Sequence, residues 1–588
     1  MCKCIGYAPG ISMNIIGINQ TGYISSVALL KDGELVAAAA EERFTRKKQT
    51  RMFPHNAFDF CLKQAGISIE DIDYIALGWN PAINIIKLQK AFSNVEKQRY
   101  MGEYFYSTPS HLLQHIKDRD FAYTEQHLNF KNKKYKTCHI NHHDAHLASS
   151  YFASPFKESA ILSADGFGEK ETVVFAVGKK SKIERLQTME FPQSIGMFYS
   201  TFTQFLGFDY DSDEWKVMAM ASFKDTNNRY YPKVKKLVRL LPDGTFELDL
   251  NYFEFYNFET TPLYNQKFID AFGQPRKPEE ELAGRHFEIA AAMQKVAEET
   301  IFHCLNWLYE KTKIKNICVS GGFFMNSVIN GKILSNTKFS DVYISSAPDD
   351  SGNCFGAALY LYNHILGHEK RYVQRSNYLG PSFSGKEIKD ELDKFKLEYR
   401  HVEDIEAVTA KLIAENKIVG WFQGAMEFGQ RALGNRSILA DPRDPSMKDR
   451  INAAVKYRES FRPFAPSILR EETRNYFDIE EGVEVPFMEK VYSIKKDKRQ
   501  LIPAVTHVDG TGRLQTVSKE TNPRYYKLIQ EFKKLTGVPV VLNTSFNLKG
   551  EPIVLSVKDA IRTFYTSGLD ILVVGNYLIE KKPRRRDS

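Results

Sequence analysis

The chain has 588 residues, which favours roughly two large domains or three to four of ordinary size. Its content of 43% hydrophobic and 26% charged residues is typical of a soluble globular protein, and no stretch approaches the roughly eighteen consecutive apolar residues of a membrane span. The terminal segment 581–588 supplies half of the net charge of +8, so the charge of the remaining chain does not favour a nucleic acid partner.

Cysteine usage and the first residues favour a cytoplasmic protein. Seven cysteines scattered through a long chain do not make a disulfide framework, which fits a reducing compartment. The N-terminus lacks the apolar run of a secretory signal, and we expect residues 1–12 to form a disordered leader. We expect the basic tail, residues 581–588, to be disordered and solvated.

The predicted N-terminal domain, residues 13–370, contains two similar α/β patterns. An apolar run at 14–19 precedes two further runs that flank Asp32-Gly33, a strong hairpin signal. A strand at 159–164, followed by a glycine-bearing turn and another hairpin, repeats this pattern. The repetition predicts two related halves, and the amphipathic run 283–312 predicts a long helix between them and the later strands.

Two histidines, His142 and His146, stand four residues apart. If this segment is helical, both imidazoles lie on one face and can bind a single metal ion. Asp165 follows a predicted strand and is a candidate third ligand, and the pair Asp349-Asp350 offers a fourth. Histidine and carboxylate ligands without thiolate suit Fe(II), Mn(II) or Zn(II). The alternative is that both histidines are ordinary polar residues of a helix face, as is common for an isolated pair.

Glycine-bearing turns follow two predicted strands of this domain. Duplicated α/β halves with such turns are typical of the actin-like ATPase architecture, in which the turns face nucleotide phosphates. Glycine there lets the nucleotide approach the backbone closely. The residues that we therefore predict to bind nucleotide are Gly166, Gly168, Ser320, Gly321, Gly322 and Asn326.

A break in the pattern at residues 371–385 predicts a linker, and residues 386–580 predict a second α/β unit. A helix is expected at 405–415. The apolar, β-branched runs of this unit predict strands at 418–422, 538–542 and 571–574.

The second unit sets several cationic side chains among glycines, prolines and apolar residues. Unpaired charges do not stay buried, so these groups require an anionic partner. Bidentate arginine contacts together with a lysine point charge suit a phosphate. A set of structural arginine–carboxylate pairs is an equally good interpretation of the residue types. The residues concerned are Arg431, Lys456, Arg458, Arg462, Arg513 and the polar segment 543–547.

Longer motifs extend these signals over nearly the whole chain. They are Glu41-Glu42-Arg43-Phe44-Thr45-Arg46, the segment with His142 and His146, Asp165-Gly166-Phe167-Gly168-Glu169, Ser320-Gly321-Gly322, Arg431-Ala432-Leu433-Gly434-Asn435-Arg436-Ser437, Phe461-Arg462-Pro463-Phe464-Ala465-Pro466, His507-Val508-Asp509-Gly510-Thr511 and Asn543-Thr544-Ser545-Phe546-Asn547. From Ile16 to about Ile579 the chain resembles the carbamoyltransferase family that includes the nodulation-factor and antibiotic O-carbamoyltransferases. This resemblance is far more specific than the spacings above.

The resemblance implies an α/β fold of two domains. The N-terminal one is of the TsaD type, within the actin-like ATPase class, and the C-terminal one is of the YrdC type. It further implies that the C-terminal domain makes carbamoyl adenylate from carbamoyl phosphate and ATP, with Mg(II) accompanying ATP. The N-terminal domain then transfers the carbamoyl group to a hydroxyl of a small-molecule natural product beside a divalent metal, usually Fe(II).

Site residues follow from the same resemblance. The metal ligands are His142, His146, Asp165 and one aspartate of the acidic pair, for which we favour Asp350. The catalytic residues are His142, Asp165, Lys48 and Arg431. The residues that match the carbamoyl phosphate and nucleotide positions of the C-terminal domain are Arg431, Lys456, Arg462, Arg513 and Ser545.

The chain departs from its relatives at two places. Many of them carry a histidine and an aspartate in the turn after the first strand, where this chain reads Gln20-Thr21-Gly22-Tyr23-Ile24. The general base therefore stays open. Ala219 replaces a usual glycine, for which we expect only a local change in packing.

Two other functions remain open from the sequence. One is threonylcarbamoyl transfer to tRNA, against which the lack of a basic stripe outside the tail argues. The other is a non-catalytic, actin-like nucleotide-binding protein. The residues do not identify the acceptor, and they leave the oligomeric state open, with a homodimer as one form.

Overall fold

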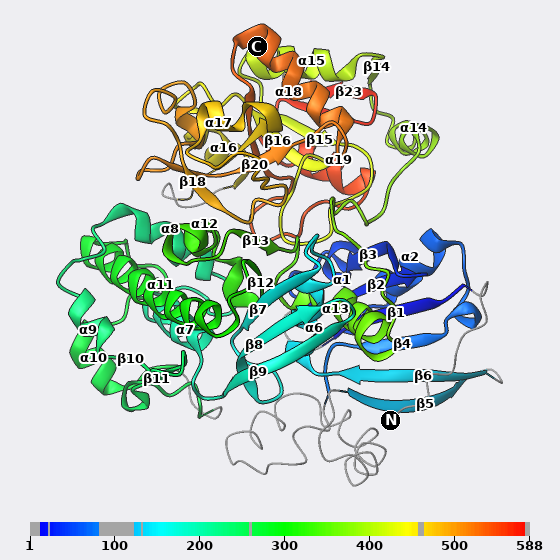
Figure 1. The fold of residues 1–588 in the computed structure, drawn as a ribbon. Coiled ribbons are helices and arrows are strands. Elements are labelled where there is room, and N and C mark those ends of the chain that lie inside the picture. The colour runs from blue at the N-terminus through cyan, green and yellow to red at the C-terminus, as the bar shows by residue number, and fades with distance from the viewer. Residues whose placement is uncertain are drawn as a thin grey trace. The chain divides into compact units, whose positions relative to one another are not determined.

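The computed structural model describes residues 12–20, 24–80, 123–130, 133–257, 262–456, 462 and 464–581. These residues form two compact units, whose helices and strands are labelled in Figure 1. The N-terminal unit comprises the described residues of 12–41 and 50–374, and the C-terminal unit those of 42–49 and 375–581. The predicted leader, apart from Ser12, and the predicted basic tail, apart from Lys581, lie outside the described residues.

The first sheet of the N-terminal unit has the strand order β3-β2-β1-β4-β6-β5. Its first three strands are antiparallel, and β4 and β6 join parallel to β1. The predicted hairpin is confirmed at Asp32 and Gly33, which both have positive φ, as a type I′ turn requires. The strands are β1 Asn14–Asn19, β2 Ser26–Lys31, β3 Glu34–Ala40, β4 Tyr74–Leu77, β5 Tyr123–Phe130 and β6 Lys133–Ile140.

The second sheet repeats this topology. Its order is β13-β12-β7-β8-β9, again with three antiparallel strands followed by two that join in parallel. The two matching sheets confirm the duplicated α/β fold predicted for the actin-like class. The strands are β7 Glu158–Ala164, β8 Glu171–Lys179, β9 Lys182–Glu190, β12 Asn316–Ser320 and β13 Asp341–Ile344.

Two helices lie between these sheets. Helix α6 (His142–Tyr151) follows the first sheet but packs on β7 and β12 of the second, whereas α13 (Asn353–Leu359) follows the second sheet and packs on β1 and β2 of the first. The helices also pack on each other, because a Cβ on Gly356 would lie only 2.1 Å from the carbonyl oxygen of Ala145. This exchange brings residues of both halves to the first turn of α6.

The predicted long helix is confirmed as α11. The other elements of the N-terminal unit surround the sheets and add a small hairpin. They are α2 His55–Ala65, α7 Ile195–Phe205, α8 Glu214–Met220, α9 Tyr231–Lys235, β10 Val238–Leu240, β11 Phe246–Leu248, α10 Gln266–Phe272, α11 Gly284–Thr312 and α12 Ser327–Asn336. Among the helices of the described residues, none combines the length and the apolar character that crossing a membrane requires.

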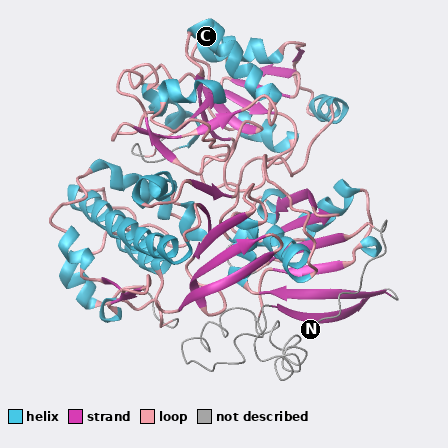
Figure 2. Cartoon of the chain, in the orientation of Figure 1, coloured by secondary structure: helices cyan, strands magenta, loops and turns pink. Residues whose placement is uncertain are grey.

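The C-terminal unit is built on one sheet with the order β14-β23-β22-β15-β16-β21-β17-β20. Helices α15 and α18 pack together against this sheet, and α19 packs on β15 and β22 (Figure 2). The strands are β14 Arg400–His401, β15 Val419–Phe422, β16 Arg436–Ala440, β17 Ala465–Leu469, β20 Gln515–Val517, β21 Val540–Ser545, β22 Ile571–Val574 and β23 Tyr577–Glu580, beside the separate pair β18 Val491–Ser493 and β19 Thr511–Arg513. The helices are α14 Gly385–Lys394, α15 Ile405–Ala414, α16 Met447–Ile451, α17 Thr473–Tyr476, α18 Pro523–Thr536 and α19 Val557–Tyr565.

Chain order and unit membership differ at one segment. Helix α1 (Glu41–Thr45) follows β3, but residues 42–49 group with the C-terminal unit. Glu41 stays in the N-terminal unit, where its carboxylate accepts the Ala57 main-chain N–H at 2.9 Å near the start of α2. The unit boundary thus falls between two consecutive glutamates, which no compositional signal in the sequence indicates.

Candidate metal centre and anion site

The four predicted metal ligands come together in the N-terminal unit. His142 and His146 lie in the first two turns of α6, and their Nε2 atoms are 3.1 Å apart. Asp165 directly follows β7, and Asp350 begins the short turn Asp350–Gly352 before α13. One ligand atom from each residue lies within 4.8 Å of all the others.

The distances fit a single bound ion. Asp165 Oδ2 lies 3.2 Å from His142 Nε2 and 3.0 Å from His146 Nε2, and Asp350 Oδ1 lies 3.4 and 3.3 Å from the same two atoms. Two ligand atoms about 2.1 Å from one ion are about 3.0 Å apart at a right angle and about 3.4 Å apart at the tetrahedral angle. The set therefore has the spacing of a coordination shell, and its nitrogen and oxygen donors suit Fe(II), Mn(II) or Zn(II).

The acidic pair divides its roles. Asp349 uses one carboxylate oxygen to accept the Ser351 hydroxyl at 2.6 Å, which fixes the turn. Asp350, the aspartate favoured from the resemblance, is the one whose carboxylate faces the imidazoles. The amide of Asn353 reaches the same place, with its nitrogen 3.3 Å from His142 Nδ1 and 3.2 Å from His146 Nε2.

The two carboxylates strongly affect the protonation of the imidazoles. Burial alone would lower the pKa of His142, but Asp350 and Asp165 outweigh it and raise this pKa to about 10. Burial opposes ionisation of Asp165 too, yet hydrogen bonds with both histidines hold its pKa well below the usual range. Two buried imidazoles thus lie 3.0 to 3.4 Å from two carboxylates whose side chains are 14% and 12% exposed, and the negative charge of these carboxylates suits a bound cation.

A carboxylate that we did not predict as a site residue fixes the start of α6. Glu169 accepts the main-chain N–H of His142 at 2.9 Å and that of Asn80 at 2.6 Å, while it is 1% exposed. A carboxyl oxygen at a helix N-terminus satisfies an otherwise unpaired N–H, and burial raises the pKa of Glu169 to about 7. Its position at the end of the Asp165–Glu169 motif is the sequence signal that marked it.

A buried ion network supports the same helix from the other side. Arg185 of β9 donates to Asp144 at 2.8 Å and to Glu171 at 2.6 Å. His143 faces away from the ligand set, bonded to the Ser163 hydroxyl at 2.8 Å. Nothing in the spacing of these residues indicated the network, because β9 approaches α6 only in the folded sheet.

Close packing explains several glycines near the ligands. A Cβ on Gly321, at φ +94°, would lie 2.1 Å from the Ala164 carbonyl oxygen, and one on Gly322 would lie 2.8 Å from Asp165 Oδ1. A Cβ on Gly168 would lie 3.0 Å from the His143 ring. These glycines thus let β7, β12 and α6 approach one another, and nucleotide binding by them stays a prediction.

Three further residues were predicted to bind nucleotide or to act in catalysis in the N-terminal domain, and their surroundings differ. Asn326 caps α12, since its Oδ1 accepts the Ile329 N–H at 3.1 Å, and its amide nitrogen donates to Gln294. Ser320 ends β12 and is buried. Lys48 groups with the C-terminal unit and is exposed there, so its predicted role in the N-terminal active site stays a prediction.

In the C-terminal unit, strand order gathers the predicted anion-binding residues at one end of the sheet. The neighbouring strands run β16-β21-β17-β20, with β21 antiparallel to β16 and β17, and β20 parallel to β17. The starts of β16, β17 and β20 therefore coincide with the end of β21. Arg431, Arg462 and Arg513 shortly precede those three starts, and Ser545 is the last residue of β21.

Lys456 joins Ser545 directly. Its Nζ donates to the Ser545 carbonyl at 2.6 Å and to both the carbonyl and the side-chain oxygen of Asn547, at 3.0 and 2.8 Å. Arg462 is 7% exposed although it carries a full charge. Arg458 lies outside the described residues.

We name residues 426–436 the Arg431 loop. Glu427 Oε1 accepts the main-chain N–H groups of Leu433, Asn435 and Arg436, at 2.7, 2.8 and 3.2 Å. A single buried carboxylate thus replaces regular secondary structure as the partner of three peptide groups. Arg436 itself stacks on Phe422, with its guanidinium carbon 3.6 Å from the ring centroid, and is a structural residue.

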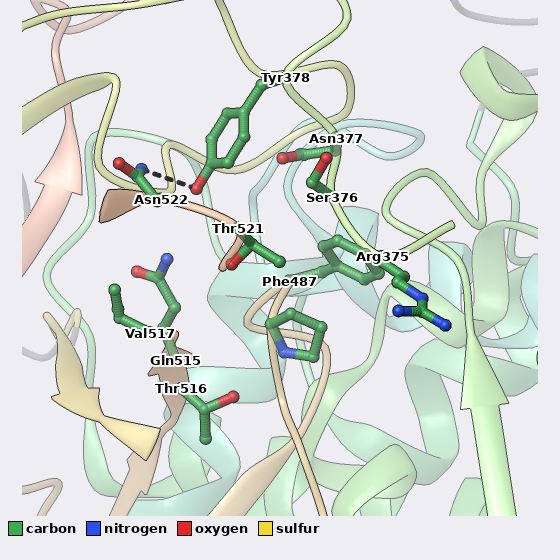
Figure 3. Close-up of a pocket in the computed structure, with 11 residues that line it drawn as sticks. Arg375, Ser376, Asn377, Tyr378, Phe487, Gln515, Thr516, Val517, Thr521 and Asn522 are labelled. Atoms are coloured by element: carbon green, nitrogen blue, oxygen red, sulfur yellow. Dashed lines mark hydrogen bonds between the residues drawn. The ribbon is translucent and has the colours of Figure 1, made fainter. Parts of the chain in front are cut away.

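The predicted linker supports this loop. The Tyr378 hydroxyl donates to the Leu433 carbonyl at 3.1 Å and accepts from Asn522 at 2.9 Å, as Figure 3 shows for the second bond. Gln515 also donates to the Leu433 carbonyl, at 3.0 Å. These three residues line a pocket of the C-terminal unit, and their hydrogen bonds make that pocket part of the scaffold behind the loop.

Comparison with known proteins places the chain in a family. The model described as carbamoyltransferase N-terminus matches residues 14–359, and the one described as carbamoyltransferase C-terminus matches residues 410–581. The uncharacterized protein sll1178 of Synechocystis sp. is 38% identical over 98% of each chain. Nodulation protein NolNO of Sinorhizobium fredii is 36% identical over 98% of this chain and 82% of its own.

The solved full-length HypF, in its phosphate- and nucleotide-bound form, is similar over 62% of this chain and 57% of its own, with 14% identity and a TM-score of 0.32. The two family models cover most of the chain and together match both units. The chain therefore belongs to the carbamoyltransferase family and is a carbamoyltransferase enzyme.

Proposed function

We propose that this enzyme is an ATP-dependent O-carbamoyltransferase. The C-terminal unit makes carbamoyl adenylate from carbamoyl phosphate and ATP, and the N-terminal unit transfers the carbamoyl group to a hydroxyl of a small-molecule natural product beside His142, His146, Asp165 and Asp350, which would hold a divalent ion. The observation that supports the proposal is the position of Arg431, Arg462 and Arg513 shortly before three strand starts at the sheet end where β21 ends with Ser545.

Adenylate formation calls for dense positive charge. Carbamoyl phosphate, one water and ATP give carbamoyl adenylate, phosphate and pyrophosphate, so that several phosphate groups must be held together. Arginine guanidinium groups bind phosphate oxygens in pairs, and preorganised cations stabilise the charge that develops as a P–O bond breaks. In this proposal Arg431, Arg462 and Arg513 hold the phosphates, and Lys456 fixes the end of β21 through Ser545 and Asn547.

Carbamoyl transfer requires an electrophilic carbonyl and an acceptor oxygen in place. The acceptor oxygen forms a bond to the carbamoyl carbon, the bond to AMP breaks, and the hydroxyl proton leaves. A divalent ion held by His142, His146, Asp165 and Asp350 would supply Lewis acidity to the oxygens of the intermediate. The protein contributes the fixed geometry, since Glu169 holds the start of α6 and Asn353 lies against both imidazoles.

The general base stays open at the residues where the chain departs from its relatives. Thr21, Gly22 and Tyr23 lie outside the described residues. The second departure, Ala219, is 9% exposed in α8.

Pyrophosphate release tests the first step. We expect purified enzyme to release pyrophosphate from ATP and Mg(II) only when carbamoyl phosphate is added, because the cation set requires both anions. Acetyl phosphate is the matched control, since it carries the same phosphate without the carbamoyl amino group. Equal release without carbamoyl phosphate would contradict the proposal.

The acceptor is tested separately. Incubation of the enzyme with carbamoyl phosphate, ATP and a cell extract should give a small molecule that gains the mass of a carbamoyl group. A parallel filter-binding assay with tRNA separates this proposal from threonylcarbamoyl transfer. Retention of tRNA together with carbamoyl incorporation into it would replace the small-molecule acceptor by a nucleic acid.

A further inference from the structure

The Arg431 loop is held by hydrogen bonds on both sides of Arg431. On the N-terminal side, the Asn377 carbonyl accepts the Phe428 N–H at 2.7 Å and the Asn377 amide donates to the Phe428 carbonyl at 3.0 Å. Glu427 binds the N–H groups of residues 433, 435 and 436, which lie after Arg431. Before Arg431 the backbone turns at Gly429, whose φ of +119° is accessible almost only to glycine. Gly429 thus links Phe428, which Asn377 holds, to the residues that Glu427 holds.

Arg43 holds that turn. Its guanidinium donates to the Gly429 carbonyl at 3.0 Å, and its other terminal nitrogen lies 3.3 Å from the Glu42 carboxylate. Arg43 is 6% exposed, so both contacts are shielded from water. A hydrogen bond from a buried charged donor is among the stronger ones in proteins.

Arg46 anchors the same segment to the C-terminal unit. Its guanidinium donates to the carbonyls of Pro552 and Ile553, both at 2.6 Å, and lies 3.7 Å from Asp559 of α19. It also donates to the Arg43 carbonyl at 3.4 Å. The segment 42–49 is thereby fixed at one end on the residues before α19, and it presents Arg43 to the Arg431 loop.

We propose that Arg43, carried by the segment 42–49, is a positioning residue for Arg431. The inference rests on the proposed function of the C-terminal unit as the site of adenylate formation. It gives a role to the Glu41–Arg46 motif, which the two sites described above left without one. Arg43 acts through the loop: it fixes the Gly429 peptide and so keeps Arg431 preorganised for phosphate.

The consequence for the reaction is specific. Without the guanidinium, the Gly429 carbonyl and Glu42 lose a buried partner, and the loop gains conformations in which Arg431 does not face its ligand. A fraction of incompetent conformations weakens apparent substrate affinity in proportion. The affinity for carbamoyl phosphate should therefore fall more than the turnover of bound substrate.

The test uses the full chain and three variants. Arg43→Met removes the donors at similar length, Arg43→Lys keeps the charge, and Lys47→Met removes one charge from an exposed side chain of the same segment as control. Amide hydrogen exchange across residues 424–436, measured by mass spectrometry without substrates, reports the loop directly. Steady-state pyrophosphate release gives KM and kcat.

We expect Arg43→Met to speed exchange in residues 424–436 by about 10- to 100-fold, as loss of a charged hydrogen bond predicts. The KM for carbamoyl phosphate should rise by a similar factor, Arg43→Lys should restore part of both, and Lys47→Met should match the unmodified enzyme. Unchanged exchange in the loop overturns the inference. So does exchange that rises equally in the core strands β15 and β22, which would indicate global destabilisation.

The exchange measurement also separates this inference from the proposed function. If the unmodified enzyme releases no pyrophosphate with carbamoyl phosphate, adenylate formation is wrong. Loop exchange in Arg43→Met still decides whether Arg43 positions the loop.

Discussion

The two sites of this enzyme are assembled in opposite ways. The proposed metal centre takes two candidate ligands from consecutive turns of one helix, a third from the residue after β7 and a fourth from the short turn before α13. The proposed anion site takes its groups from segments that precede β16, β17 and β20 and from the end of β21. The first site depends on helical spacing, the second on strand order.

This difference predicts different responses to substitution. In the proposed metal centre each imidazole lies 3.0 to 3.4 Å from the other imidazole and from both carboxylates, so that loss of one group leaves its neighbours without a compensating charge. In the anion site the contacts between Lys456 and Ser545 belong to the sheet, whereas Arg431 depends on the preorganisation of its loop. A single substitution should therefore abolish the activity of the site in the N-terminal unit but only reduce that of the site in the C-terminal unit.

The largest effect is expected from removal of an imidazole. Replacing an outer partner of a metal ligand costs about 10- to 100-fold in affinity, so His146→Ala should lower Fe(II) or Mn(II) affinity by more than about 100-fold. Transfer should be abolished and pyrophosphate release should stay within about twofold. Elemental analysis and metal titration measure the first result, with the exposed His55→Ala as control. Metal content that equals that of the unmodified enzyme would exclude His146 as a ligand.

The reciprocal experiment addresses the anion site. Loss of one preorganised charge-stabilising group typically slows a reaction by about 10²- to 10³-fold, which we expect for pyrophosphate release by Arg431→Met. Bound metal should not change. Arg474→Met, which removes an exposed guanidinium paired with Glu481, provides the matched control. A fall in metal content with Arg431→Met would contradict the independence of the two sites.

Glu169 tests how far the metal centre depends on its support. Glu169→Ala removes the acceptor of the His142 N–H, and we expect metal affinity to fall by about 10- to 100-fold. Glu169→Gln keeps an oxygen acceptor and should recover part of the loss. Isothermal titration with Mn(II) measures both variants. Equal affinities for the two variants and the unmodified enzyme would show that α6 needs no such cap.

Proton release should accompany metal binding. The carboxylates raise the pKa of His142 to about 10, so this imidazole is protonated at neutral pH before metal arrives, and it must be neutral to bind. Affinity should therefore rise by about tenfold per pH unit between pH 6 and 9, for each proton displaced. Titration calorimetry in buffers of different ionisation enthalpy counts the protons. Affinity that is constant over this range would contradict the charge assigned to His142.

The sequence predicted most of the candidate metal ligands. Two features allowed this: the four-residue spacing of His142 and His146, and the position of Asp165 after a strand. Both are local, so they can be recognised from the sequence alone. Choosing Asp350 over Asp349 required the resemblance, and the structure then showed Asp349 bonded to Ser351 instead. The groups that support α6 could not be predicted from the sequence, because Arg185 reaches Asp144 of α6 only when β9 pairs with β8.

The C-terminal site shows the opposite balance. Residue types alone suggested an anion site and structural ion pairs equally, and Arg436 is a structural residue while the neighbouring Arg431 stays a predicted ligand. The membership of residues 42–49 in the C-terminal unit had no sequence signal. The contact between Arg43 and Gly429 joins residues almost four hundred positions apart, which no periodicity encodes.

By itself the sequence determined the duplicated α/β pattern, the two-unit organisation and the family, because hairpin turns, helical periodicity and long motifs are properties of neighbouring residues. Only the tertiary structure decided which groups meet. Because α6 and α13 each pack on the sheet of the other half, four candidate ligand atoms lie close together. The order β16-β21-β17-β20 places cationic residues that are far apart in the sequence at one end of the C-terminal sheet. Strand order and helix exchange arise from burial of whole faces, a property that belongs to the assembled fold.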